Sequence, residues 1–298
     1  MTYYFAIAGF YIRIIFDNNK YDIMDLIPSF TPFKIENTPT NESFLFTLTI
    51  DEELSPIEKT KLKLIRKFDT GNGDTAVFHI DNGGYQYIIA NINKVQCCLL
   101  QTNKDFSNCH CALNGSYMNW CFGLNNALML IFAFASCKYQ TLLIHASVVG
   151  KDNYAYAFIA KSGTGKSTQS SMWLQSISGC ELINDDNPIV RIIDNTPYIY
   201  GSPWSGKTAC YRNIRMKLGA IVRIDRASEN SIDKLKPTEA FASILPSCSA
   251  MKWDHTLFTD LCKTLSLLIE ARVSYILHCL PNKESALLCY KTVKSQTE

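Results

Sequence analysis

Short apolar runs rich in aromatic and β-branched residues dominate the first third of the chain. They cover residues 3–16, 44–50, 74–80, 85–92 and 94–102. Runs of this length and composition favour strands, and the Asp81-Asn82-Gly83-Gly84 segment is typical of a hairpin turn because glycine tolerates positive φ. The pattern therefore predicts a β-rich N-terminal module over residues 1–115.

The pattern changes near residue 120, where longer segments begin to alternate with short apolar runs. Helices are predicted at residues 121–138, 167–176, 238–245, 259–271 and 283–293. Strands are predicted at residues 141–149, 154–160, 181–183, 189–193, 198–200, 218–224 and 275–280. Strands that alternate with helices indicate an α/β fold, which is predicted for residues 116–298.

The composition is typical of a folded chain and bears on which classes of partner it binds. The 298 residues carry 29 Lys and Arg against 27 Asp and Glu, and 47% are hydrophobic. This balance is typical of a globular protein. The net charge of +2 lacks the basic excess that favours nucleic acid or an anionic membrane surface. The longest strongly apolar run, residues 127–137, is shorter than the roughly 18 residues of a membrane span. We expect no nucleic-acid partner and no membrane partner.

The twelve cysteines bear on the cell compartment. Most stand singly among apolar neighbours, where a thiol behaves as a small hydrophobic group, and no CxxC pair occurs. Only Cys109-His110-Cys111 is a candidate metal cluster, and ligands so close in sequence chelate poorly. The N-terminus lacks a basic start and a small-residue cleavage pattern, so no signal peptide is expected. These features predict a cytoplasmic protein with reduced thiols.

The strongest chemical signal is a glycine-rich loop at residues 160–168. It reads Ala-Lys-Ser-Gly-Thr-Gly-Lys-Ser-Thr, which is a Walker A pattern with alanine in place of the first glycine. A predicted strand precedes it and a predicted helix follows it. Its glycines let backbone N–H groups turn toward phosphate oxygens, and the helix adds the positive end of its dipole. A glycine turn with an accidental lysine is the alternative.

The loop predicts which residues bind a nucleotide and its metal. The expected nucleotide-binding residues are Ser162, Gly163, Thr164, Gly165, Lys166, Ser167 and Thr168. We expect Lys166 to reach the β- and γ-phosphates of ATP and the Ser167 hydroxyl to ligate Mg²⁺.

Two adjacent carboxylates, Asp185 and Asp186, follow a short apolar run after the loop and its helix. One carboxylate can hold Mg²⁺ while the other accepts the proton of an attacking hydroxyl. Taken alone, this segment would be interpreted as a turn. His145 lies in the strand predicted before the loop strand. Such a histidine is usually a core residue, but beside a phosphate site it can orient or polarise a carboxylate.

Three segments in this order, LLIHASVV, FIAKSGTGKST and LINDDNPIV, resemble the C-terminal kinase domain of HPr kinase/phosphorylase. That family has a phosphoenolpyruvate-carboxykinase-like P-loop fold, and the resemblance covers residues 126–222. It implies that Asp185 is the catalytic carboxylate acting on a serine hydroxyl and that His145 supports it. It further implies that Asp186 belongs to the metal site and its hydrogen-bond network, and that Lys166 takes part in catalysis.

The sequence departs from the family at two places. The family carries a glutamate shortly before the glycine that corresponds to Gly201, whereas residues 198–200 read Tyr-Ile-Tyr. The resemblance therefore does not extend to a second metal ligand or to phosphorolysis. The segment at residues 201–208 is similar to a divergent branch in which some proteins act on peptides or small molecules. Residues 1–110 do not resemble the usual N-terminal domain of the family.

A basic segment follows Gly201 and offers further phosphate contacts. Lys207, Arg212 and Arg215 are candidates for a phosphate clamp, and Trp204 is a candidate cover for a nucleotide. The alternative is a solvated basic loop. Arg226 is expected to be a surface charge.

Together these patterns predict an ATP- and Mg²⁺-dependent kinase that phosphorylates an aliphatic hydroxyl, with serine as the expected acceptor group. The acceptor can be a protein, a peptide or a small metabolite. Two alternatives stay open, namely a carboxykinase-like enzyme and a catalytically weak nucleotide-binding sensor or scaffold. The sequence also leaves open whether ATP, ADP or pyrophosphate is the donor and whether the chain forms a homo-oligomer.

Overall fold

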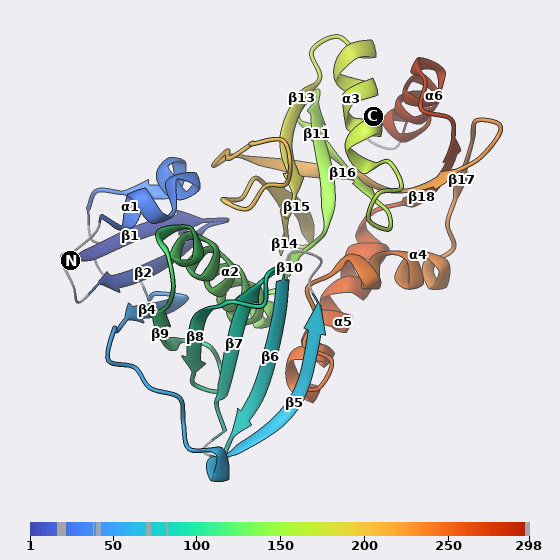
Figure 1. Ribbon diagram of the computed structural model, residues 1–298. Helices are drawn as coiled ribbons and strands as arrows, with labels where there is room; N and C mark the ends of the chain where they lie inside the picture. Colours follow the sequence, from blue (N-terminus) through green and yellow to red (C-terminus); the bar gives the residue numbers. More distant parts are fainter. Residues whose placement is uncertain (17–21, 38, 40–42, 70–72, 82, 296–298) are drawn as a thin grey trace. The chain divides into compact units, whose positions relative to one another are not determined.

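The computed structural model describes residues 1–298 except 17–21, 38, 40–42, 70–72, 82 and 296–298. The chain divides into two compact units, Met1–Ser136 and Cys137–Glu298. Each unit contains a large mixed sheet of nine strands within the described residues (Figure 1). The protein is therefore a mixed α/β protein with two sheets.

The sheet of the first unit has the strand order β3-β1-β2-β4-β9-β8-β7-β6-β5. Its strands are β1 (Thr2–Ile7), β2 (Phe10–Phe16), β3 (Lys34–Ile35), β4 (Phe46–Ile50), β5 (Leu62–Asp69), β6 (Gly73–Ile80), β7 (Tyr85–Asn91), β8 (Gln96–Thr102) and β9 (Asn108–Leu113). Strand β4 runs parallel to both of its neighbours, and the other pairs are antiparallel. The β-rich character predicted for this part of the chain is confirmed.

The hairpins of this sheet follow turn chemistry. The predicted run at residues 3–16 consists of two strands, because Ala8 and Gly9 adopt positive φ values of 49° and 76° and reverse the chain. Strands β6 and β7 form the predicted hairpin. Asn82 of its turn lies outside the described residues.

Two helices accompany the first sheet, the short α1 (Ile23–Leu26) and the long α2 (Tyr117–Ala135). Helix α2 packs on β7, β8 and β9. Phe134 lies against Phe106 with ring centroids 5.3 Å apart, and a Cβ at Gly123 would come within 2.8 Å of the Cys97 carbonyl oxygen. Because α2 covers this face, the boundary between the units falls after residue 136 and not after residue 115 as predicted.

Helix α2 is also long and apolar enough to cross a membrane by length and composition alone. Half of its most apolar window is buried within the protein, and a core helix of a folded domain passes the same test. The absence of a membrane partner stays a prediction.

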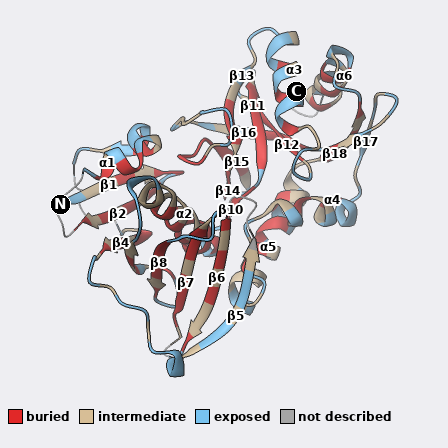
Figure 2. Ribbon diagram, in the orientation of Figure 1, coloured by how far each residue is buried: buried red, intermediate tan, exposed pale blue. Residues whose placement is uncertain are grey.

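Burial differs across the sheet of the first unit. Figure 2 shows β7 largely buried and β5, at the edge of the sheet, largely exposed.

The sheet of the second unit has the order β10-β14-β15-β16-β12-β11-β13, and β18 pairs with both β16 and β17. Its strands are β10 (Thr141–Leu143), β11 (Ala146–Lys151), β12 (Tyr154–Ile159), β13 (Glu181–Asp186), β14 (Ile189–Ile193), β15 (Thr196–Tyr200), β16 (Arg215–Arg226), β17 (Ser231–Lys234) and β18 (Ser274–Cys279). Strands β12, β16 and β18 are parallel. Strand β11 is antiparallel to β12 and to β13, so β13 runs in the direction of β12.

Helices cover both faces of the second sheet. They are α3 (Lys166–Ser176), α4 (Pro237–Ile244), α5 (His255–Ala271) and α6 (Lys283–Lys294). On one face, Trp173 of α3 is fully buried among Tyr156, Phe158 and Tyr290 of α6. On the other face, Leu265 belongs to a core that α4, α5 and the sheet share. The predicted α/β alternation is confirmed for this unit.

One strand predicted for the second unit is in fact two. The run at residues 141–149 breaks at Ile144 and His145, because β10 pairs with β14 whereas β11 pairs with β12 and β13. The His145 N–H donates to the Ser247 carbonyl oxygen at 2.7 Å instead of to a strand neighbour. His145 therefore directly precedes β11 and does not lie in the middle of a strand.

All twelve cysteines are free. In β9, Cys109 and Cys111 are buried, while His110 between them points to the opposite face of the sheet. The three side chains therefore do not converge on a common point. Burial raises the pKa of the Cys248 thiol to about 12, so this group stays protonated at neutral pH.

Candidate functional site

Sheet topology brings three of the predicted segments to one edge. Strands β12 and β13 run in the same direction with β11 between them, so both end where β11 begins. The phosphate loop (residues 160–168) follows β12, Asp185 and Asp186 end β13, and His145 directly precedes β11. The carboxyl ends of strands are where open α/β sheets bind ligands. The candidate site therefore lies at this edge.

The phosphate loop joins β12 to α3, and the strand and the helix predicted on either side of it are confirmed. Gly163 and Gly165 have φ values of 75° and 134°. A Cβ at either position would meet no atom within 4 Å, so it is the backbone conformation and not space that requires glycine. Ser162 and Thr168 are exposed beside them.

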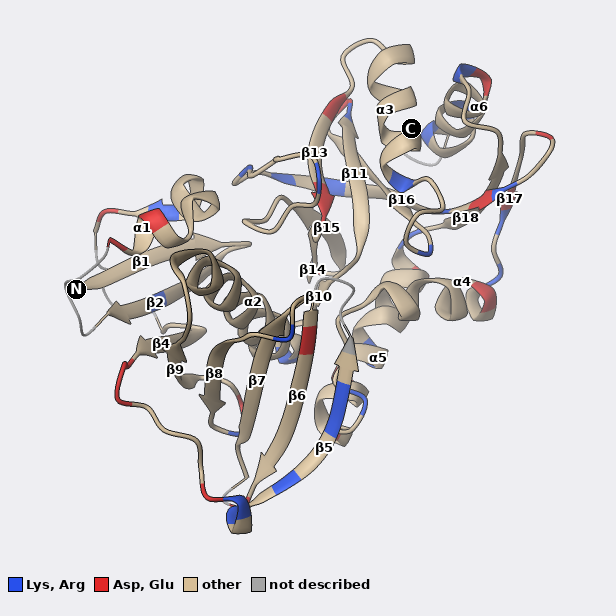
Figure 3. Cartoon of the chain, in the orientation of Figure 1, with Lys and Arg blue, Asp and Glu red and all other residues tan. Residues whose placement is uncertain are grey.

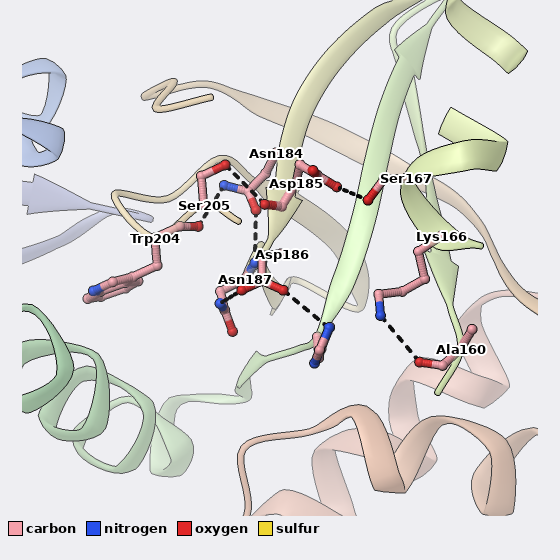
Figure 4. A network of polar contacts seen from close by, with 10 residues as sticks. Ala160, Lys166, Ser167, Asn184, Asp185, Asp186, Asn187, Trp204 and Ser205 are labelled. Carbon is pink, nitrogen blue, oxygen red and sulfur yellow. Dashed lines mark hydrogen bonds and ion pairs between the residues drawn. The ribbon is translucent and has the colours of Figure 1, made fainter. Parts of the chain in front are cut away.

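Lys166 begins α3 and is mostly buried. Its Nζ donates to the Ala160 carbonyl oxygen at 3.4 Å, which holds the ammonium group across the base of the loop (Figure 4). Burial lowers the pKa of Lys166, while the charges of Asp186 and Asp185 act in the opposite direction. The lysine is thus positioned between the loop and the acidic pair.

Asp185 connects β13 to the phosphate loop. It is 4% exposed, and its Oδ1 accepts a hydrogen bond from the Ser167 hydroxyl at 3.0 Å (Figure 4). A second contact ties α3 to the sheet, because the hydroxyls of Ser147 and Ser170 lie 2.7 Å apart. The phosphate loop and the acidic pair are therefore in contact through the side chains of Ser167 and Asp185.

Asp186 occupies different surroundings from Asp185. Its backbone has a φ of 135°, its Oδ1 lies 3.1 Å from His145 Nε2, and its Oδ2 accepts from Asn187 Nδ2 at 2.8 Å. The side chains of His145 and Asp186 are 46% and 36% exposed. The sequence resemblance paired His145 with Asp185. That pairing is wrong, because Asp185 points to α3 whereas Asp186 turns toward the start of β11.

The protonation state of His145 follows from its neighbours. Partial burial lowers the pKa of His145, and the positive charge of Lys166 lowers it further, while Asp186 and Asp185 raise it by less. At neutral pH the imidazole is therefore neutral. A neutral ring with its proton on Nε2 can donate a hydrogen bond to Asp186 Oδ1.

Asn184 was missed by sequence reasoning. It is fully buried in β13, and its Nδ2 donates to the Ser202 hydroxyl at 3.2 Å and to the Trp204 carbonyl oxygen at 3.1 Å. Its Oδ1 accepts from the Asn187 N–H at 3.0 Å. The sequence does contain a signal for Asn184, which is a polar side chain at the end of an apolar run and directly before two aspartates. Asn184 holds the chain after β15 against the acidic pair.

The segment at residues 202–208, here called the basic loop, lies against Asp185. The Asp185 carbonyl oxygen accepts from the Ser205 hydroxyl at 3.0 Å and from the Gly206 N–H. A Cβ at Gly206 would lie 3.2 Å from this oxygen and from Asp186 Cβ, so the close approach favours glycine. Trp204 is buried and does not lie open as a cover.

Basic residues recur along β16 and the preceding segment (Figure 3), and only some of them reach the site. Lys207 is exposed and directly follows Gly206. Arg212 donates to the Leu182 carbonyl oxygen at 2.6 Å and to Glu181 Oε2 at 2.8 Å, at the opposite end of β13. Arg215 lies over the Tyr198 ring, 4.8 Å from its centroid. The structure therefore brings Lys207, but not Arg212 or Arg215, next to the acidic pair.

Arg226 is a further residue that sequence reasoning missed. It ends β16, and its Nε donates to the Thr164 carbonyl oxygen at 3.0 Å while its Nη2 donates to the Gly163 carbonyl oxygen at 2.5 Å. Arg226 is exposed as predicted, but its guanidinium group is bound to the phosphate loop.

The donor atoms of the site fit a magnesium nucleotide. Within the residues that the structure describes, no group of three or more His, Cys, Asp and Glu side chains could hold a metal ion. Mg²⁺ does not need such a cage, because it is commonly held by one or two carboxylates, substrate phosphates and water. Ser167 Oγ and Asp185 Oδ1, 3.0 Å apart at the mouth of the loop, supply two oxygen atoms of the required kind.

No protein-family model matches the sequence, and no curated protein matches it. Among solved structures, the chain is similar to the Hpr(Ser) kinase/phosphatase from Coxiella burnetii, with a TM-score of 0.33 and 10% sequence identity. The match covers 52% of this chain and 90% of the Coxiella chain. The similarity is weak and distant, and it carries no information about the reaction.

Proposed function

We propose that this chain is a phosphotransferase that moves the γ-phosphoryl group of ATP to an aliphatic hydroxyl, with serine as the favoured acceptor group. The observation that carries the proposal is the contact between Ser167 of the phosphate loop and Asp185 of the acidic pair at 3.0 Å. It supports a site in which a phosphate cradle and carboxylates act on the same group, as phosphoryl transfer requires.

The donor side consists of the phosphate loop and α3. Backbone N–H groups of the loop and the N-terminus of α3 would bind the phosphate oxygens, and Lys166 would neutralise charge on the β- and γ-phosphates. The buried position of Lys166 strengthens its interaction with an anion, because water screens it less.

Ser167 and Asp185 would hold Mg²⁺ together with the nucleotide phosphates, and the ion would supply charge neutralisation there. The loop pattern assigned the metal to Ser167, and the resemblance to the kinase family added Asp186. The hydrogen bond from Ser167 favours Asp185 instead, since this carboxylate faces the loop.

Asp186 is better placed than Asp185 to act on the acceptor. It is more exposed, and His145 and Asn187 orient its two oxygens. In the proposed step the acceptor oxygen bonds to the γ-phosphorus, the bond to the bridging oxygen of ADP breaks, and Asp186 accepts the hydroxyl proton. The contacts from His145 and Asn187 would hold the Asp186 carboxylate in position to take this proton.

The two carboxylates are distinguished by replacing each with asparagine. Transfer from γ-labelled ATP to free serine, a serine-containing peptide or a cell extract is measured over a range of Mg²⁺ concentrations. We expect Asp185→Asn to raise the Mg²⁺ concentration needed for half-maximal transfer. We expect Asp186→Asn to lower the maximal rate by about 10²–10⁴-fold at unchanged Mg²⁺ dependence.

Glu181→Gln is the matched control, because Glu181 lies on the same strand and contacts Arg212 at its opposite end. It is expected to transfer like the wild type. Nucleotide binding without a labelled acceptor would contradict the kinase and favour a sensor or scaffold. Asp186→Asn with full activity would contradict the assignment of the base.

A further inference from the structure

We infer that Arg226 is a positioning residue of the phosphate loop, which holds the loop in its anion-binding form and thereby sets the affinity for nucleotide phosphates. The inference rests on the proposed nucleotide site and adds a residue outside the Walker A pattern. Arg226 lies 58 positions after the end of that pattern (226 − 168), on a different strand.

Strand pairing explains why Arg226 reaches the loop. Strands β12 and β16 are parallel, and Ile159 at the end of β12 pairs with Arg223. Strand β16 continues for three more residues, beyond the point where β12 gives way to the loop. Arg226 therefore stands beside the first turn of the loop, where its side chain donates to two consecutive carbonyl oxygens.

The contact selects one orientation of the loop peptides. A trans peptide is planar, with its C=O and N–H on opposite sides. Since the Thr164 carbonyl points to Arg226, the N–H of Gly165 points to the other side of the loop. The preceding carbonyl, from Gly163, is held by the same guanidinium group. Arg226 therefore prevents these two peptides from flipping.

The loop needs such support because it has little packing of its own. Apart from the adjoining residues, no described atom lies within 4 Å of a Cβ built at Gly163 or Gly165, and glycine has the widest choice of backbone conformations. The Thr164 N–H donates to the Lys161 carbonyl oxygen at 3.1 Å, which closes a single turn. An arginine fork can bind two carbonyl oxygens at fixed spacing, which a lysine point charge cannot do.

Lysine and alanine replacements separate geometry from charge. Arg226→Lys keeps the positive charge but loses the two-point contact, and Arg226→Ala loses both. Arg223→Lys and Arg223→Ala are matched controls on the same strand, since Arg223 contacts Ser243 at 3.4 Å and not the loop. Binding of ADP with Mg²⁺ and of inorganic pyrophosphate is measured by calorimetry on the full chain. Hydrogen exchange of residues 160–166 is measured without ligand.

We expect both Arg226 variants to bind ADP and pyrophosphate about tenfold more weakly, the loss that corresponds to about 1.4 kcal/mol. Hydrogen exchange in the phosphate loop should be faster in both Arg226 variants than in the wild type. Both Arg223 variants should match the wild type in affinity and in hydrogen exchange. Where transfer is measurable, the KM for ATP should rise while kcat changes by less than about twofold, as for a lost ground-state interaction.

Wild-type affinity and exchange in Arg226→Lys would overturn the inference, because charge alone would then suffice. Unchanged binding by Arg226→Ala would overturn it as well, and so would a wild-type chain that binds neither ligand. A wild type that binds ADP but transfers no phosphate contradicts the proposed kinase and leaves the role of Arg226 intact.

Discussion

Asp185 and Asp186 are neighbours in the sequence but have different partners. Asp185 is buried and accepts from Ser167, whereas Asp186 is more exposed and lies beside His145 and Asn187. Consecutive strand residues point to opposite sides, so a pair of adjacent carboxylates supplies one group to the phosphate loop and one to the open side of the site. In the proposed function, this separation would let Asp185 bind the metal while Asp186 accepts the proton.

At this residue scale, His145 is expected to make stability depend on pH. Its pKa is lower in the folded chain than the value of about 6.5 for an unfolded one. As the pH falls below about 6.5, the unfolded state takes up a proton that folded His145 does not, so the free energy of unfolding decreases. The groups that face the ring are Lys166, Asp185 and Asp186.

The measurement is urea unfolding of the wild type and of His145→Gln between about pH 5 and pH 8. The wild type should lose stability relative to the variant as the pH falls through about 6.5. Asp186→Asn should enlarge this loss, because it removes a charge that raises the pKa of His145. A constant difference between the wild type and His145→Gln would contradict the prediction.

At the scale of elements, the basic loop depends on strand β13 for its position. Asn184 of β13 donates to Ser202 and Trp204, and Ser205 and Gly206 of the loop donate back to Asp185. These hydrogen bonds hold the basic loop against the acidic pair. The sheet thus positions the basic loop, which has no regular secondary structure of its own.

Asn184→Ala removes the donor to Ser202 and Trp204 and the acceptor of the Asn187 N–H. We expect a loss of about 2 kcal/mol in the free energy of unfolding, measured by urea unfolding. Transfer should fall by at least about tenfold, because the loop no longer holds its place beside Asp185. The affinity for ADP should stay within about twofold, since the phosphate loop is untouched.

Asn126→Ala is the control for this change. Asn126 also donates from Nδ2 to a backbone carbonyl, that of Phe122, but within α2 of the first unit. Its replacement should leave transfer unchanged. Equal loss of transfer in the two variants would show that the effect of Asn184 is not exerted through the basic loop.

At the scale of the whole molecule, the chain carries two cores in two units. The first unit includes α2, whose residues Leu124, Leu128 and Ile131 are fully buried, so its sheet is not covered without residues beyond 115. The second unit carries the phosphate loop, the acidic pair, His145 and Arg226 within residues 137–298. All the groups of the candidate site therefore belong to one unit.

A comparison of two N-terminal fragments tests this division. The fragment of residues 1–136 should be monomeric on size-exclusion chromatography. Its thermal unfolding, monitored by circular dichroism, should show one cooperative transition. Residues 1–115 lack α2 and expose an apolar sheet face, which favours aggregation. A cooperative melt of the shorter fragment would contradict the assignment of α2 to the first core.

Features that depend on short-range chemistry could be predicted from the residues alone. The glycines of the phosphate loop, the helix that follows it and the alternation of strands and helices after residue 140 were all predictable, because local backbone preferences and hydrophobic periodicity encode them. The candidate residues Lys166, Ser167, Asp185, Asp186 and His145 were named from the loop motif, from the adjacent carboxylates and from the resemblance to a known family.

The pairing of these residues could be seen only in the folded chain. Contacts between His145 and Asp186, between Arg226 and the phosphate loop, and between Asn184 and the basic loop join segments far apart in the chain. Such contacts depend on strand order, strand direction and register, and a single sequence does not encode these locally. The same reason moved the boundary between the units to residue 136, since helix α2 belongs to whichever sheet its apolar face covers.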